Sequence, residues 1–122
     1  MESILTSVKK MLGIAEDYEH FDQDLIMHIN SVFAILTQLG VGPVEGFSIK
    51  DKAAVWTDSI PANQQLEFVK SYVFLKVKIL FDPPLSSAVI ESMNRMISEL
   101  EWRINVAADY SKNEWEEEFQ NE

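Results

Sequence analysis

The 122-residue sequence contains no cysteine. Disulfides, thiolate metal sites and a cysteine nucleophile are therefore excluded, and the composition fits a reducing compartment. Long apolar runs are also missing, because no stretch approaches the roughly 20 residues of a membrane span. The N-terminal MESILTSVKK has neither the basic region nor the apolar stretch of a secretory signal. We expect a soluble, intracellular protein that binds no membrane.

Basic residues are scarce, with ten Lys and Arg against twenty Asp and Glu and a formal net charge of -10. A nucleic-acid interface needs clustered Lys and Arg, so this excess of acidic residues argues against binding of DNA or RNA. The acids concentrate near the C-terminus: residues 109–122 hold six acids and one base, Lys112, which gives this segment a charge of -5. Half of the net charge therefore lies in that tail.

The usual signatures of enzymes are absent. There is no phosphate-cradling glycine loop, no His-Glu-x-x-His pair and no Gly-x-Ser-x-Gly elbow. His20, Asp24 and His28 could bind a metal only if a helix began before His20, whereas we expect Asp22 to cap that helix and His28 to pack beside its apolar stripe. Paired carboxylates are common, but nothing indicates the burial that raises a carboxyl pKa. The sequence predicts no catalysis, no metal site and no cofactor.

Apolar residues recur at helical spacing along most of the chain, and no segment predicts a clear strand. We predict an all-α fold, a small helical bundle of four to five helices with a Gly/Pro loop, in one domain over residues 1–108, followed by the acidic tail, residues 109–122. Gly13 and Gly40 are expected to end the first two helices. The predicted helical segments are about 3–12, 23–39, 51–56, 62–81 and 87–107.

The segments 62–81 and 87–107 carry the patterns that bear on assembly. The first has two apolar faces, which indicates burial on two sides, either within the monomer or against a neighbouring subunit. One face holds Leu66, Val69, Val73, Val77 and Leu80, and the other holds Phe68, Tyr72, Leu75 and Ile79. The second segment has a narrow apolar seam of Val89, Met93, Met96 or Ile97, Leu100 and Ile104. Its opposite side carries Glu91, Arg95, Glu99 and Arg103. Alternating charge at this spacing favours a solvated, self-paired face over a subunit contact.

A double proline separates these two helices, in the stretch KILFDPPLSS, residues 78–87. Pro83 and Pro84 lack amide protons, and each pushes the residue before it, Asp82 or Pro83, out of the helical region. The preceding helix must therefore stop near Phe81, and Ser86 or Ser87 can cap the next one. We predict that Asp82, Pro83 and Pro84 form the structural hinge of a helical hairpin.

Two segments are candidates for binding a partner. The loop GVGPVEGFSIK, residues 40–50, holds three of the four glycines together with the apolar residues Val41, Val44, Phe47 and Ile49. These side chains either tuck onto the core or meet a partner, with Val44 and Phe47 as the candidate contacts. The tail sets Tyr110, Trp115 and Phe119 among acids, a composition typical of a docking arm. The alternative is that the last helix continues and these aromatic side chains pack on the core.

The order of these features resembles the small head-tail connector proteins of long-tailed bacteriophages, also called head-completion or adaptor proteins. The resemblance runs from Ile4 to Ile104, and its most specific parts are YVFLKVKILFDPP, residues 72–84, and ELEWRI, residues 99–104. It implies a helical bundle of which about twelve copies form a ring on the portal protein. DNA would pass through the channel of the ring without specific binding, and a tail-side completion or stopper protein would bind below.

The resemblance also implies a place in the virion, at the head-tail interface, after synthesis in the bacterial host cytoplasm. The acidic tail would be an arm onto the portal, and the loop 40–50 would contact neighbours or the tail-side partner. A different class of function stays open: a small acidic helical regulator that binds one basic protein partner, for example by mimicking the charge of nucleic acid. Stoichiometry separates the two, since a regulator should saturate at one or two copies.

Overall fold

The computed structural model describes the backbone of residues 2–120 and the side chains of residues 2–108. Four α-helices and one short 3-10 helix make up this part of the chain, which holds no β-strand and only an isolated bridge between Ser3 and Val55. The elements are α1 (Ile4–Met11), α2 (Asp22–Gln38), η1 (Trp56–Asp58), α3 (Gln64–Phe81) and α4 (Ser87–Gln120). The predicted all-α fold is confirmed.

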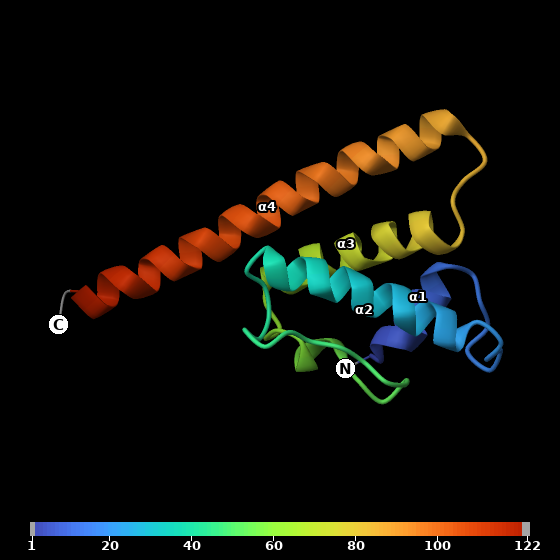
Figure 1. The fold of residues 1–122 in the computed structure, drawn as a ribbon, viewed down its shortest axis with the longest axis horizontal. Helices are drawn as coiled ribbons and strands as arrows, with labels where there is room; N and C mark the ends of the chain where they lie inside the picture. The colour runs from blue at the N-terminus through green and yellow to red at the C-terminus, as the bar shows by residue number, and fades with distance from the viewer. Residues whose placement is uncertain (1, 121–122) are drawn as a thin grey trace.

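Helix α3 lies between α2 on one side and α4 on the other, while α1 packs on α2 (Figure 1). This arrangement explains the two apolar faces of α3 within the monomer. Val69 and Val73 are fully buried, and so is Tyr72 on the second face. Leu80, predicted to lie on the first face, is half exposed because it falls in the last turn of α3, next to the hinge.

The start of α2 differs from the prediction. Asp22 is the first residue of the helix and not its cap, and the residue before it, Phe21, makes no capping hydrogen bond with its side chain. The carboxylate of Asp22 instead lies 2.9 Å from the ammonium group of Lys9, whose side chain is almost fully buried in α1. Burying a lysine without an anion is costly, so this ion pair takes precedence over capping. Lys9 also donates to the carbonyl of Glu16, at 2.8 Å.

The loop 40–50 is anchored to the bundle by one side chain of α2. Asn30 donates to the carbonyl of Ile49 at 3.0 Å and accepts from its amide at 2.8 Å, and Ile49 and Val41 are buried. The helical turn predicted at 51–56 forms later, as η1. The reason is Trp56, whose buried indole N–H donates to the hydroxyl of Ser7 at 3.0 Å, which fixes this segment against α1.

The helix boundaries on either side of the double proline are as predicted. Helix α3 ends at Phe81, and Asp82 leaves the helical region with φ -143 while its carboxylate accepts from Lys78 at 2.8 Å. The hydroxyl of Ser86 accepts from the amide of Val89 at 3.4 Å, so Ser86 is the residue that caps α4. Asp82, Pro83 and Pro84 thus lie between two antiparallel helices (Figure 1).

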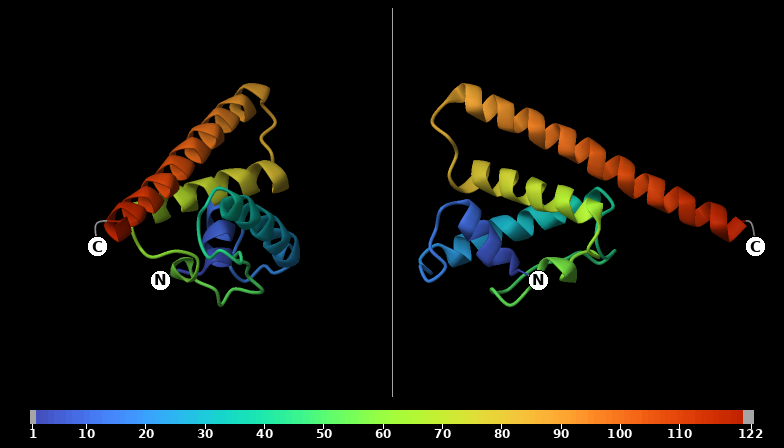
Figure 2. Two further views of the ribbon diagram at one scale, coloured as in Figure 1. Left: turned by 60° about the vertical axis from the view of Figure 1, so that its left-hand side comes forward. Right: turned by 180° about the vertical axis from the view of Figure 1, so that it is seen from behind.

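The predicted end of the last helix, near Ala107, is wrong. The backbone of α4 stays helical to Gln120. No glycine or proline occurs after Pro84, so no local signal stops the helix where the composition becomes acidic. The C-terminal part of α4 runs well past the ends of α2 and α3 in all views (Figures 1 and 2).

Candidate assembly surfaces

Helix α4 is attached to α3 by a narrow line of apolar contacts. Ile97 and Ile104 are the buried hydrophobic residues of α4 among its described side chains, with Met93 and Leu100 partly buried beside them. The seam therefore runs through Ile97 and not through Met96, which is 52% exposed. Much of the apolar surface of α4 is left uncovered.

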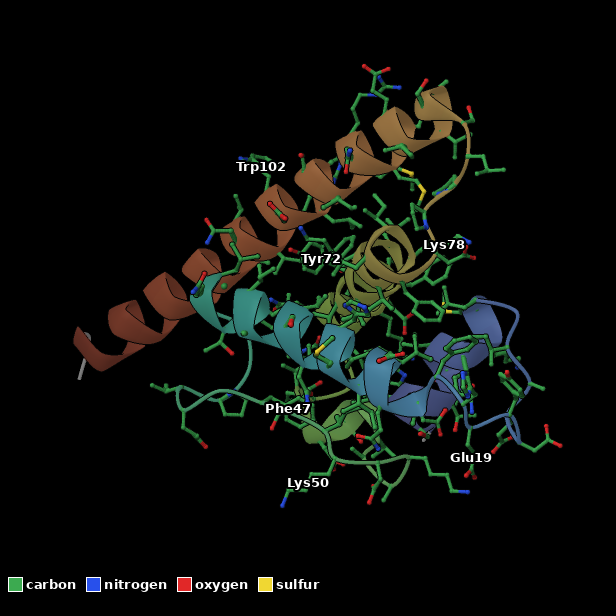
Figure 3. All side chains as sticks on the ribbon, turned by 45° about the vertical axis from the view of Figure 1, so that its right-hand side comes forward. Glu19, Phe47, Lys50, Tyr72, Lys78 and Trp102 are labelled. Atoms are coloured by element: carbon green, nitrogen blue, oxygen red, sulfur yellow. The ribbon has the colours of Figure 1, made fainter. Side chains whose placement is uncertain are left out.

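A partly buried polar contact crosses the same junction. The hydroxyl of Tyr72 donates to a carboxylate oxygen of Glu101 at 2.8 Å, and the ammonium group of Lys76 lies 3.9 Å from that oxygen. Figure 3 shows Tyr72 between α3 and α4. Burial, and then the hydrogen bond and negative charge of Glu101, raise the pKa of the Tyr72 hydroxyl well above its ordinary value. Tyr72 therefore keeps its proton and holds α4 in one rotation.

The C-terminal end of α2 supports α4 from a second direction. The side-chain amide of Asn105 donates to the carbonyl of Leu39 at 3.3 Å. Gly40, which ends α2 with φ +90, sits so close that an added Cβ would lie 3.4 Å from the Cβ of Ala108. These contacts fix the direction of α4 where it leaves the bundle.

An open groove with mainly apolar walls follows the junction of the two helices on the surface. We call it the α3–α4 groove. Its two adjoining stretches are lined by Phe68, Ser71, Leu75, Met96, Glu99, Leu100, Trp102, Arg103, Val106 and Ala107. Trp102 is 66% exposed and lies on the outer side of α4 (Figure 3). Exposed large apolar residues gathered in one place on a small bundle are typical of a protein contact.

Trp102 lies within the stretch ELEWRI but was not predicted as a site residue. It lies outside the apolar seam of α4, between Glu101 and Arg103, where a tryptophan has no packing role in the monomer. The sequence signal that could have identified it is a large aromatic residue on the polar side of an amphipathic helix.

The charged ladder of α4 is only half paired. Arg103 binds Glu99 through two nitrogens, at 2.9 and 3.1 Å. Arg95 instead binds the hydroxyl of Ser92, at 3.1 Å, within the described side chains. The solvated, self-paired face therefore forms around Glu99 and Arg103, and this pair borders the α3–α4 groove.

The two candidate contacts of the loop have different surroundings. Val44 is 97% exposed, whereas Phe47 packs edge-on against Phe33 of α2, with ring centroids 4.8 Å apart. Phe47 thus helps to hold the loop, at the edge of a hollow on α2 (Figure 3). A role of Val44 and Phe47 in binding a partner stays a prediction.

The aromatic residues of the tail, Tyr110, Trp115 and Phe119, belong to α4, but their side chains lie outside the described residues. Their role as a docking arm stays a prediction.

The histidines pack against aromatic rings. His20 lies edge-on to Phe21 at 4.9 Å, and His28 lies 6.4 Å from Phe81, both measured between ring centroids. Within the described part of the chain, no group of three or more His, Asp or Glu side chains is placed to hold a metal ion. No described helix combines the length and the apolar character that crossing a membrane requires.

Comparison with known proteins bears on the role of these surfaces. A family model described as phage connector protein matches residues 4–111, which include all of α1, α2 and α3. No curated protein and no solved structure matches the chain. The family match confirms the resemblance found in the sequence and gives the protein a structural, connector-type role. The chain belongs to the phage connector protein family.

Proposed function

We propose that this protein is a head-tail connector subunit that assembles as a ring on the portal protein and extends the DNA channel toward the tail. The observation that carries the proposal is the α3–α4 groove, because a bundle with a well-buried core leaves a row of large apolar side chains open on one side. A subunit that stays single has no use for such a surface, whereas a ring covers it.

The distribution of charge supports a channel wall. Residues 1–63 carry four bases and nine acids, a charge of -5, and residues 64–108 carry five of each, a charge of zero. With the -5 of residues 109–122 these sum to the total of -10. Negative charge on a surface that faces DNA repels phosphates, so DNA would slide through without specific binding.

The hinge would set the shape of the subunit. Asp82, Pro83 and Pro84 fix where α3 ends, and Ser86 fixes where α4 begins, so the angle between the two helices depends on a short rigid connection. A ring of about twelve copies needs a constant wedge angle in every subunit. The tail-side completion or stopper protein would then bind the opposite face, with Val44 and Phe47 as the candidate contacts. The protein would act in the virion, after synthesis in the bacterial host cytoplasm, without catalysis or a cofactor.

The test is co-sedimentation with the portal protein of the same phage. The full chain is compared with a chain truncated after Ala108, and circular dichroism verifies that both fold. Binding of about twelve copies per portal ring, lost on truncation, would support the connector and the docking role of the tail together. Saturation at one or two copies on a basic partner, with no binding to the portal, would instead favour the acidic regulator.

A further inference from the structure

Helix α4 is much longer than the helix on which it lies. With a rise of 1.5 Å per residue, its 34 residues span about 51 Å, against about 27 Å for the 18 residues of α3. Phe68, in the second turn of α3, already lies beside Val106 and Ala107. The following residues, 109–120, form a helical extension that runs past the bundle (Figure 2). An isolated helix of this length is marginal in water, so a partner that covers one side would stabilise it.

The spacing of the three aromatic residues of the extension puts two of them on one side of the helix and Tyr110 on the other. Trp115 and Phe119 are four residues apart, which puts them on the same face of the helix. The acids Glu116, Glu117 and Glu118 separate them and fall largely on the other faces. A helix of this kind binds a partner by laying its apolar face into a groove.

The α3–α4 groove matches this helix in length and chemistry. Along α4 it reaches from Met96 to Ala107, twelve residues or about 18 Å, and the extension 109–120 is also twelve residues or about 18 Å long. The groove offers the large apolar side chains Phe68, Met96 and Trp102. A helix with an aromatic pair on one face and an apolar groove as long as that helix are therefore present on the same chain.

The distribution of charge also favours the α3–α4 groove as the binding surface for the extension. The extension is part of a segment with a charge of -5, which residues 1–63 of another copy, also at -5, would repel. Residues 64–108 carry no net charge, and in the groove Arg103, which lines both stretches, is balanced by Glu99, which lines one. The hairpin of α3 and α4 is thus the least repulsive surface that a second copy offers.

The contact must be made between copies. The groove lies alongside Met96 to Ala107, and the extension continues the same helix away from it, so a chain cannot reach its own groove without breaking α4. We infer that the helical extension of α4, residues 109–120, docks in the α3–α4 groove of a neighbouring copy. The extension and the groove are two different surfaces of the chain, so the contact between copies is heterologous. Such a contact closes into a ring when the rotation from one copy to the next divides a full turn. This inference rests on the proposed function and assigns the contact between subunits of that ring.

Disulfide trapping in the full chain tests the contact, since the sequence has no cysteine of its own. One copy carries Ser71→Cys in the groove, and the other carries Ser111→Cys in the extension, four residues before Trp115 and so on the face of Trp115 and Phe119. After mixing, at high concentration and again on portal rings, mild oxidation should give a disulfide-linked dimer of the two variants. The matched control replaces Ser71→Cys with Thr57→Cys, an exposed position in η1 remote from the groove, and should give at least tenfold less dimer.

Each result of the cross-linking experiment supports or overturns the contact between copies. Absence of the Ser71–Ser111 dimer under both conditions would overturn the inference, and so would a cross-link from Ser111→Cys to the portal alone, which would assign the extension to the portal. Sedimentation of the same samples reports portal binding separately. Loss of portal binding with an intact cross-link would refute the proposed ring on the portal and leave the contact between copies standing.

A complementation experiment excludes effects of misfolding. Met96→Glu places a charge in the groove at a position that is already half exposed, and Trp115→Ser with Phe119→Ser removes the aromatic face of the extension. Each variant alone should associate at least tenfold more weakly than the wild type. Mixed, they should form a one-to-one dimer, because one intact extension and one intact groove remain. Self-association of either variant at the wild-type level would contradict the assignment.

Discussion

Replacing Tyr72 with phenylalanine should loosen α4 from the bundle without removing an apolar contact. The aromatic ring stays in place, and only the hydroxyl that donates to Glu101 at 2.8 Å is lost. Tyr72 itself is fully buried. The substitution therefore isolates the partly buried hydrogen bond from Tyr72 on α3 to Glu101 on α4.

The expected loss at pH 7 is about 1.5 kcal/mol of unfolding free energy. A hydrogen bond to a charged group contributes about 1.5–3 kcal/mol. The lower end applies because the side chain of Glu101 is 36% exposed, so water and Lys76 can replace the lost donor. For a chain of this size the midpoint of thermal unfolding should fall by about 6 °C.

The difference in unfolding free energy between the wild type and Tyr72→Phe should shrink as the pH rises. Burial raises the pKa of Tyr72 far above the ordinary value of 10, so the native state keeps a proton that the unfolded state loses above pH 10. The unfolded state then binds fewer protons, so this contribution to stability, present in full below pH 10, is lost as the pH rises above 10, by roughly 1 kcal/mol per pH unit. Phenylalanine has no proton to lose, so wild type and variant should be about equally stable at pH 11.

Urea unfolding followed by circular dichroism at pH 7, 9, 10 and 11 measures the difference directly. Tyr18→Phe is the control, because Tyr18 is half exposed and its substitution should change stability at pH 7 by less than about 0.5 kcal/mol. A difference between wild type and Tyr72→Phe that stays constant from pH 7 to pH 11 would refute the raised pKa and the reasoning built on it.

Three further substitutions separate folding from assembly. Ser7→Ala should cost about 1–3 kcal/mol, measured by urea unfolding, because the buried indole N–H of Trp56 loses its acceptor. Lys9→Met should cost about 3 kcal/mol in the same assay, since it leaves the carboxylate of Asp22 unpaired in a partly buried site. Val44→Asp should change stability by less than about 0.5 kcal/mol, yet weaken binding of the tail-side protein to portal-bound rings, measured by co-sedimentation.

Element boundaries were predictable where a local signal sets them. Gly13 and Gly40 take positive φ values where the first two helices end, a conformation that favours glycine. The two prolines end α3 at Phe81, and a serine opens α4. These signals act within a few residues, so sequence alone is sufficient to read them.

The predictions of the Asp22 cap and of the turn at 51–56 were wrong because contacts between distant segments decide both. Asp22 has the side chain of a helix cap, but a buried lysine thirteen residues earlier in the chain takes its carboxylate. The turn predicted at 51–56 moved to Trp56–Asp58 because the indole of Trp56 binds a hydroxyl on α1. Neither partner can be identified from local sequence, since each depends on how the helices pack.

The assembly surface was only partly predictable. The two faces of α3 and the seam of α4 were legible as patterns, but which apolar residues stay uncovered depends on how α4 is rotated on α3. The bond from Tyr72 to Glu101 and the burial of Ile97 in place of Met96 set that rotation. As a result Met96 and Trp102 face outward, and Trp102 was not predicted as a site residue.

The narrow attachment of α4 makes its direction sensitive to small changes in the bundle. From Ile104, the last buried residue described in α4, sixteen residues lead to Gln120, a lever of about 24 Å. A tilt of about 10° at the seam would move the tip by about 4 Å, roughly the width of a side chain. The close approach of Gly40 to Ala108 and the bond from Asn105 to Leu39 resist such a tilt. These residues touch no proposed partner, yet they determine where the extension of α4 points, so in a closed ring their packing sets the angle at which one copy meets the next.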